Sequence, residues 1–276
     1  MKKKVRFLEK TNGIIAMIHV RALPGTPRCE EDIPRIIDTA VEEAAIYARE
    51  GIDMMMLENM HDVPYLNRSV GPEITASLTA VAQAVKREFP KKILGLQILA
   101  GANCEALAVA QAAQLDFIRA EGFVFAHTAD EGIMNADAGP LLRYRRQIGA
   151  ENIKVFTDIK KKHSSHTLTA DVSIAETAAA AEYFLSDGVI VTGKSTGCPA
   201  DIEELRAVRE AVDIPVLIGS GVTIENVAGY FPLADALIVG SFFKKDGQWA
   251  NAIDPARVAR FMEKVNHIRN IPFDRG

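Results

Sequence analysis

The chain has 276 residues, of which 48% are hydrophobic and 25% are charged, and its formal net charge at pH 7 is −4. This composition is typical of a globular protein and excludes collagen-like, disordered and coiled-coil classes. The negative charge argues against nucleic acid as a partner, because binding to nucleic acid usually requires a surface rich in Lys and Arg.

Eight short runs rich in Val, Ile, Leu and Met recur along the chain, and each predicts a β-strand. These runs cover residues 14–20, 54–59, 93–99, 116–121, 153–159, 188–193, 215–220 and 236–241. Because the runs are almost continuously apolar, they indicate parallel strands that are covered on both faces.

Helical patterns follow the predicted strands, and two of them begin with clear signals. Apolar residues recur at helical spacing over 32–50. Ser173 and Glu176 have the spacing of a capping box, and Asp254 followed by Pro255 predicts an N-cap and a first-turn proline. A shorter helix is expected from about residue 224 to 230, and another helix around 138–148.

Eight strand–helix units in a chain of this length predict an α/β fold, a single (β/α)8 TIM barrel. We expect one domain over residues 1–276, with residues 1–13 as an N-terminal extension that covers the bottom of the barrel. An open doubly wound sheet is the alternative. In dinucleotide-binding proteins that sheet carries G-x-G-x-x-G after its first strand, whereas the first strand here runs into HVRALPGTP.

Polar residues follow the first six predicted strands, at the end of the barrel where TIM-barrel enzymes have their active sites. We predict that seven of them bind substrate: Arg21, Asn59, His61, Gln97, Arg119, Glu121 and Thr192. Lys194 and Thr196 come shortly after Thr192 in the same loop. The alternative is that these are ordinary loop residues exposed to water.

The fifth strand leads into the segment FTDIKKKHSSH, which we interpret as the chemical centre. Asp158 ends this strand, and the two-residue alternation of a strand places Lys160 on the same face. The predicted catalytic residues are Asp158, Lys160, Glu58, His19 and His163. The alternative is that Lys160 to Lys162 form a solvated basic loop.

The loops after the last two strands predict a phosphate site, because glycines there let backbone N–H groups approach an anion. The short helix from about residue 224 should point its positive end at the same place. The predicted phosphate ligands are Gly219, Ser220, Gly221, Val222, Gly240, Ser241 and Lys244. Alternatively, the glycines only relieve crowding in tight turns.

No metal site is assigned from the sequence. A two-metal hydrolase would be expected to show H-x-H after the first strand, where this chain has His19-Val20-Arg21. A single divalent ion held by Glu58, Asp62 or Asp158 together with His61 remains open.

Three cysteines, Cys29, Cys104 and Cys198, match no metal-ligand spacing, and an odd number cannot all pair within the chain. The first thirty residues lack the layout of a signal peptide, and no apolar run reaches the roughly 20 residues that span a bilayer. We therefore expect a cytoplasmic protein without a transmembrane segment, for which peripheral membrane contact stays open.

Several segments together resemble the BtpA/SgcQ family over about residues 14–262, among them MIHVRALPGTP, LENMHDVPY, DFIRAEGFVFAHTADEG, PVLIGSGVTIENV and LIVGSFFKKDGQW. The resemblance implies a barrel of the ribulose-phosphate-binding type. It also implies two different roles. The cyanobacterial namesake is regarded as a membrane-associated factor for photosystem I accumulation, whereas relatives occur in bacteria without a photosystem and near sugar-transport genes. Some members are labelled phosphoribosylanthranilate isomerases, but the cysteine that this activity implies at the end of the first strand is His19 here.

Two functions therefore compete. The first is an enzyme of isomerase or lyase type that acts on a phosphorylated sugar or a similar small metabolite, and the sequence favours it because histidines, carboxylates and lysines gather beside an anion site. The second is a non-enzymatic assembly or stabilisation factor for a membrane complex such as photosystem I. An apolar surface for the second role would have to come from Phe123, Phe125, Phe242, Phe243 and Trp249. We also expect a homo-oligomer, at least a dimer.

Overall fold

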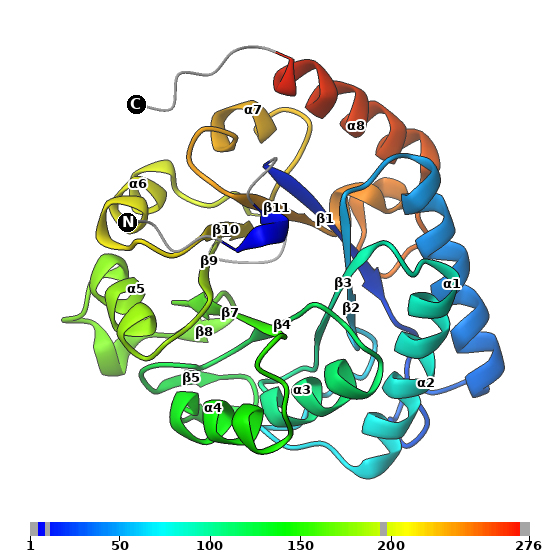
Figure 1. Ribbon diagram of the computed structural model, residues 1–276, viewed down its shortest axis with the longest axis horizontal. Coiled ribbons are helices and arrows are strands. Elements are labelled where there is room, and N and C mark those ends of the chain that lie inside the picture. Colours follow the sequence, from blue (N-terminus) through cyan, green and yellow to red (C-terminus); the bar gives the residue numbers. More distant parts are fainter. Residues whose placement is uncertain (1–4, 9–11, 194–197, 271–276) are drawn as a thin grey trace.

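In the computed structural model, which describes residues 5–8, 12–193 and 198–270, eight parallel strands close into a barrel (Figure 1). In spatial order they are β1 (Gly13–His19), β11 (Ala236–Val239), β10 (Val216–Gly219), β9 (Gly188–Thr192), β7 (Lys154–Ile159), β4 (Phe117–Ala120), β3 (Ile93–Gln97) and β2 (Met54–Glu58). The TIM-barrel prediction is confirmed, and every barrel strand falls on one of the predicted runs.

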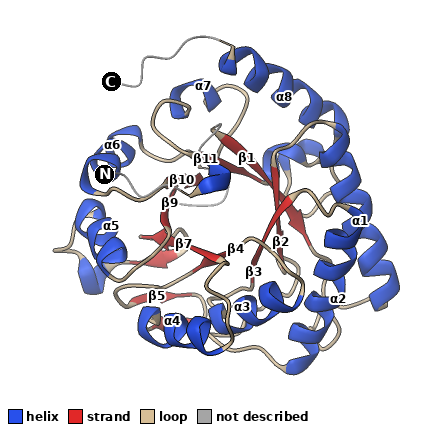
Figure 2. Cartoon of the chain, in the orientation of Figure 1, coloured by secondary structure: helices blue, strands red, loops and turns tan. Residues whose placement is uncertain are grey.

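Eight helices surround the barrel among the described residues (Figure 2). They are α1 (Ile33–Arg49), α2 (Pro72–Glu88), α3 (Asn103–Ala112), α4 (Ala138–Gln147), α5 (Ile174–Tyr183), α6 (Ile202–Ala211), α7 (Val227–Tyr230) and α8 (Pro255–Arg269). The capping box of Ser173 and Glu176 is present, and the Asp254 side chain caps α8. The helix expected from about residue 224 is shorter than predicted, because α7 begins only at Val227.

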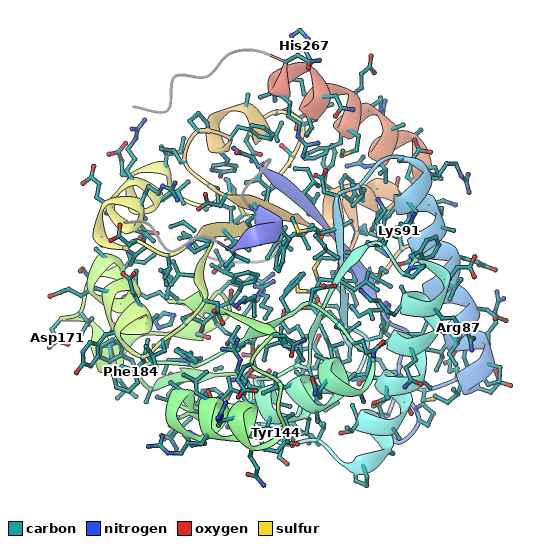
Figure 3. All side chains as sticks on the ribbon, in the orientation of Figure 1. Arg87, Lys91, Tyr144, Asp171, Phe184 and His267 are labelled. Atoms are coloured by element: carbon teal, nitrogen blue, oxygen red, sulfur yellow. The ribbon has the colours of Figure 1, made fainter. Side chains whose placement is uncertain are left out.

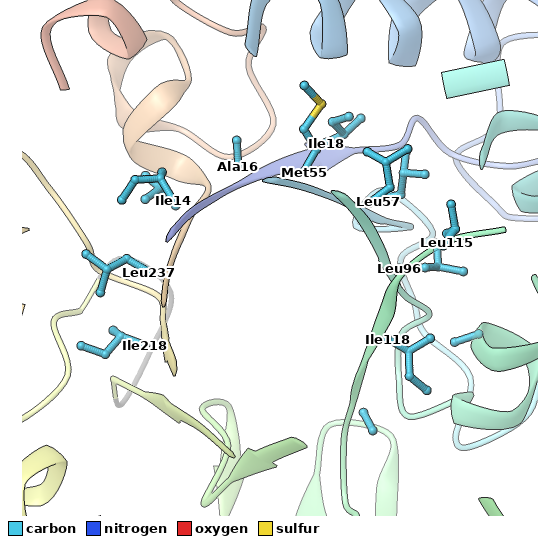
Figure 4. Packing of buried hydrophobic residues seen from close by; sticks show 14 of the residues in the cluster. Ile14, Ala16, Ile18, Met55, Leu57, Leu96, Leu115, Ile118, Ile218 and Leu237 are labelled. Atoms are coloured by element: carbon cyan, nitrogen blue, oxygen red, sulfur yellow. The ribbon is translucent and has the colours of Figure 1, made fainter. Parts of the chain in front are cut away.

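Alternation along each strand divides the barrel's apolar residues into two groups. Ile14, Ala16 and Ile18 of β1 point outward to the helices and belong to the main core (Figure 4). Ile15 and Met17 point inward and belong to a separate cluster inside the barrel.

Large side chains fill the N-terminal end of the barrel. Phe117 fits there because β3 has Gly95 opposite, where a Cβ would lie 2.2 Å from the Phe117 ring. The short 3-10 helix η1 (Arg6–Leu8) closes this end, since Leu8 joins the inner cluster and the Phe7 ring lies 6.1 Å from that of Phe117 and 6.2 Å from that of Phe156. Ligands must therefore enter from the opposite end.

The loops after β4 and β7 build a small antiparallel sheet that the sequence analysis did not predict. It consists of β5 (His127–Ala129), β6 (Gly132–Met134) and β8 (Ser164–Ser165), and three further 3-10 helices are η2 (Thr167–Thr169), η3 (Ser241–Phe243) and η4 (Lys245–Gly247). Within the described ranges, no helix is long and apolar enough to cross a membrane. His267 lies on α8 at the outer rim of the molecule (Figure 3).

Candidate active site at the mouth of the barrel

Two adjoining cavities open at the C-terminal ends of the barrel strands. The first, of about 220 Å³, is lined mainly by the loops after β10 and β11, and we call it the glycine-loop cavity. The second, of about 260 Å³, is lined mainly by residues that follow β2, β3, β4 and β7, and we call it the carboxylate cavity. Glu58, Met60, Arg119 and Lys162 line both cavities, so the two share one wall.

The glycine-loop cavity combines backbone, hydroxyl and guanidinium groups. Its loops contribute Ser220, Gly221, Val222, Thr223, Gly240 and Ser241. The Asn226 amide fixes the first loop, because it accepts from the Thr223 N–H at 2.8 Å and donates to the Gly221 carbonyl at 2.7 Å. Five of the seven predicted phosphate ligands thus line this cavity.

Arg257, which the sequence analysis missed, adds a guanidinium to the lining of this cavity. Its Nε donates to the Phe242 carbonyl at 2.6 Å, and its guanidinium lies 4.6 Å from the centre of the Phe242 ring. Its place in the first turn of α8, directly after the last βα-loop, is the signal that could have identified it.

Lys244 and Gly219, the other two predicted phosphate ligands, line neither cavity. The Lys244 Nζ lies 2.6 Å from Glu43 Oε1 on α1, and the side chain is 1% exposed. The expectation that Lys244 reaches a phosphate is therefore wrong. The expected contribution from the start of α7 is also wrong, because that helix has only four residues.

Gly221 is required for space as well as for conformation. Its φ is +66°, and a Cβ would lie 2.1 Å from the Cys198 carbonyl oxygen. A side chain at position 221 would thus displace the loop, so the crowding interpretation of the glycines holds at this position.

A buried ion pair between Arg119 and Asp158 lies at the wall that the two cavities share. The Arg119 guanidinium donates to the Asp158 carboxylate from Nε at 3.2 and 3.1 Å and from Nη2 at 3.0 Å. Burial lowers the pKa of Arg119, but the charges of Asp158 and Glu58 more than compensate and raise it. Arg119 is consequently a fixed cation, and its hydrogen-bonded partner is Asp158.

Glu121 organises the carboxylate cavity. It accepts from Gln97 Nε2 at 2.9 Å and from Lys161 Nζ at 2.8 Å. Burial lowers the pKa of Lys161, but Glu121 raises it by more. Among the described residues, the Gln97 Oε1 atom is buried without a hydrogen-bond partner, and Gln97 lines the carboxylate cavity.

His19 and Glu58 face each other at the top of β1 and β2. His19 Nδ1 is 3.0 Å from the Trp249 carbonyl, and its Nε2 is 3.8 Å from Glu58 Oε2. Burial, followed by the charge of Lys244, lowers the pKa of His19 to about 3, so the ring is neutral and Nδ1 carries the proton. Burial also raises the pKa of Glu58. A neutral imidazole beside a carboxyl with a raised pKa is an arrangement suited to general acid–base catalysis.

Lys160 does not share a face with Asp158, contrary to the predicted alternation. Strand β7 ends at Ile159, and Lys160 has a φ of +45°, which turns the backbone. The Lys160 Nζ donates to the Thr169 carbonyl at 3.2 Å outside both cavities, while Lys161 and Lys162 enter the barrel mouth. His163 does line the carboxylate cavity, as an exposed side chain whose pKa is lowered, chiefly by burial.

Four other predicted residues lie outside the two cavities. Asn59 accepts from the Leu99 N–H at 2.7 Å and donates to Asp62 at 2.9 Å, so it joins two loops. Thr192 accepts from the Lys162 N–H at 3.1 Å. Arg21 and His61 line a separate surface hollow of about 440 Å³, where burial and then the charge of Arg21 lower the pKa of His61 to about 4. Lys194 and Thr196 lie outside the described residues.

The candidate metal ligands do not converge. The Asp158 carboxylate forms an ion pair with Arg119. The Asp62 carboxylate accepts hydrogen bonds from the Leu23 N–H at 2.8 Å and from the Asn59 side chain. Where the structure describes the chain, it brings no three His, Cys, Asp or Glu side chains together as a metal site. The residues present therefore do not fit the single divalent ion that the sequence left open.

A closed eight-stranded barrel whose charged residues gather at one mouth defines a TIM-barrel protein with a small-molecule-sized site. The model of the BtpA family matches residues 10–267, so the chain belongs to the BtpA family. The family resemblance seen in the sequence is thus confirmed.

Relatives and solved structures agree with this assignment. A mitochondrial protein of Caenorhabditis elegans is 49% identical over 93% of this chain and 94% of its own. The photosystem I biogenesis protein BtpA of Synechocystis is 31% identical over 92% of this chain and 88% of its own. The thiamine phosphate pyrophosphorylase of Pyrococcus furiosus shares the fold, with a TM-score of 0.58 and 14% identity over 95% of this chain and 98% of that one.

Proposed function

We propose that this protein is an enzyme of isomerase or lyase type that acts on a phosphorylated sugar or a similar small metabolite. The observation that carries the proposal is the shared wall of the two cavities. One cavity offers anion-binding groups, the other offers buried acid–base groups, and Glu58, Arg119 and Lys162 belong to both. A ligand that spans them would place its phosphate and its reacting carbons at fixed separate positions.

In this proposal the phosphate lies among the N–H groups of Gly221, Val222, Gly240 and Ser241, and Arg257 takes the place that the sequence gave to Lys244. Glu58 moves a proton on the substrate carbons, because burial raises the pKa of its carboxyl and so makes it a better proton acceptor than an exposed carboxylate. The neutral His19 ring is its partner.

The remaining polar residues hold the substrate and the catalytic groups in place. Gln97 and Glu121 orient substrate hydroxyls, His163 is a further acid–base group at the rim, and the Arg119–Asp158 pair stabilises developing negative charge. We keep the expectations of a cytoplasmic location and a homo-oligomer as part of the proposal.

The second candidate is an assembly factor that contacts a membrane or a membrane complex. Three large apolar side chains are exposed on or near the small sheet at the mouth: Leu66 at 56%, Ile133 at 61% and Leu168 at 61%. The aromatic patch that the sequence offered for this role does not form, because Phe123 and Phe243 are buried. The exposed side chains of Leu66, Ile133 and Leu168 are the structural observation that favours the alternative.

The test compares sugar phosphates with their dephosphorylated parents by calorimetric titration. We expect binding of phosphorylated compounds only, and a loss of roughly tenfold or more in affinity in Arg257→Gln, which removes a charge-assisted contact. Arg260→Gln is the matched control, since Arg260 is exposed on the same helix. Equal binding of parents and phosphates would contradict the enzyme proposal. Co-sedimentation with anionic lipid vesicles that depends on Leu168 would instead favour the assembly role.

A further inference from the structure

Lys162 occupies the position between the two cavities. It follows β7 in a segment where Lys160 and His163 have φ values of +45° and +54°, and these two turns direct the intervening residues toward the mouth. The Lys162 N–H donates to Thr192 Oγ1 at 3.1 Å, which ties this backbone to the end of β9. The side chain lines both the glycine-loop cavity and the carboxylate cavity.

The surroundings of Lys162 lower the pKa of its amine. Burial lowers its pKa most, and the positive charge of Arg119 lowers it further, against the opposing charges of Glu58, Asp158 and Glu121. Arg119 stays cationic because Asp158 holds it by three hydrogen bonds. A lysine that is desolvated beside a fixed cation is the usual arrangement of a nucleophilic amine.

Lys161 makes a useful contrast within the same loop. Its Nζ is 2.8 Å from Glu121, which keeps it protonated despite its burial. The pKa values of these two adjacent lysines are thus shifted in opposite directions, and of the two only Lys162 lies on the wall that both cavities share.

We propose that Lys162 forms a Schiff base with the carbonyl carbon of an open-chain aldose or ketose phosphate. This inference rests on the proposed function and narrows its substrate class to phosphorylated compounds with a carbonyl group. With the phosphate in the glycine-loop cavity, the carbonyl of such a compound would lie at the wall where Lys162 is placed.

The step balances without a further reactant. The Nζ lone pair attacks the carbonyl carbon, the C=O π bond breaks, and proton transfer from nitrogen to oxygen gives a carbinolamine. Protonation of its hydroxyl by Glu58 releases water and leaves the iminium, whose adjacent C–H or C–C bond is then weakened. Hydrolysis by one water returns the amine and the carbonyl.

Reductive trapping tests the proposal. The full-length protein is incubated with glycolaldehyde phosphate, dihydroxyacetone phosphate or ribose 5-phosphate, reduced with borohydride and analysed by peptide mass spectrometry. Borohydride supplies the hydride that converts the imine to a stable secondary amine. We expect one main adduct, on Lys162. Its yield should be at least roughly tenfold lower with the dephosphorylated parents, or when inorganic phosphate competes with the phosphorylated probe.

Two variants at position 162 and one at a neighbouring lysine make the result specific. Lys162→Met and Lys162→Arg should lose the adduct while still binding the phosphorylated probes, and the Arg variant keeps the charge if the Met variant does not fold. Lys160→Met should be trapped like the wild type, because Lys160 lies outside both cavities.

The outcomes separate this inference from the proposed function. Binding of the phosphorylated probes without an adduct on Lys162, or equal trapping on Lys160, would overturn the Schiff base and leave the enzyme proposal standing. An adduct on Lys162 that forms equally with parents and phosphates would support the nucleophile and contradict the phosphate site.

Discussion

His19 illustrates how a single position couples the site to the stability of the fold. The ring is buried between Glu58 and Trp249, and its folded-state pKa of about 3 lies well below the ordinary value of 6.5. At a pH between these two pKa values, the His19 ring is protonated in the unfolded chain and neutral in the folded protein. Stability therefore falls as the pH falls below about 6.5.

We predict that His19→Asn removes this part of the pH dependence. From roughly pH 7 to pH 5, the wild type should lose about 2 kcal/mol more unfolding free energy than the variant. Urea denaturation across this range measures the difference. His61 and His127, whose pKa values are also lowered, remain in both proteins and cancel in the comparison.

His267→Asn is the control for this experiment, because His267 is exposed on α8. It should leave the wild-type curve unchanged. Parallel curves for the wild type and His19→Asn would show that His19 is protonated in the folded protein.

At the scale of the element, the regular parts of the chain were predictable and the loops were not. The eight strands were found because an apolar run flanked by turn residues depends only on local sequence. Two-residue alternation holds along β4, where Arg119 lies on the inner face with Phe117. It failed at Lys160, because a left-handed residue directly after a strand ends the alternation.

Long-range pairs also decided which residues were wrongly assigned to the candidate site and which were missed. Lys244 meets Glu43 across 201 positions of sequence, and no local pattern reports such a contact. Arg257 and Lys162 reach the mouth only because α8 and the β7 loop return to the same rim. The side of the barrel that carries the site was therefore predictable, whereas the choice among neighbouring charged residues was not.

The 3-10 helix at the N-terminal end of the barrel gives a prediction for an element. Leu8 is 7% exposed and packs into the inner cluster, so Leu8→Ala should lower the free energy of unfolding by about 2 kcal/mol or more. Leu168→Ala, at a leucine that is 61% exposed, should change it by less than about 0.5 kcal/mol. Equal effects in urea denaturation would mean that η1 does not seal the barrel in solution.

At the scale of the whole molecule, the candidate site and the hydrophobic core are both built on the same closed sheet. Every barrel strand contributes to the continuous ring of pairings, and the side chains of the mouth stand directly on it. The loops that carry the site are therefore expected to unfold together with the helices.

Trp249 reports on the unfolding of the barrel mouth, because it is the only tryptophan of the chain and lines the carboxylate cavity. Its ring lies 5.0 Å from that of His61 and 6.3 Å from that of His19. We predict that the urea transition followed by its fluorescence coincides with the one followed by far-ultraviolet circular dichroism. A fluorescence midpoint at clearly lower urea would show that the mouth opens separately.

The two cavities draw most of their walls from different stretches of the chain. The loops of the glycine-loop cavity and Arg257 fall within residues 220–257, whereas the carboxylate cavity takes all its lining residues except Trp249 from residues 58–163. Under the proposed function, substitutions within residues 58–163 would therefore change the acid–base groups and leave the phosphate-binding loops intact. Reaction and ligand binding could then evolve separately in two different stretches of one gene.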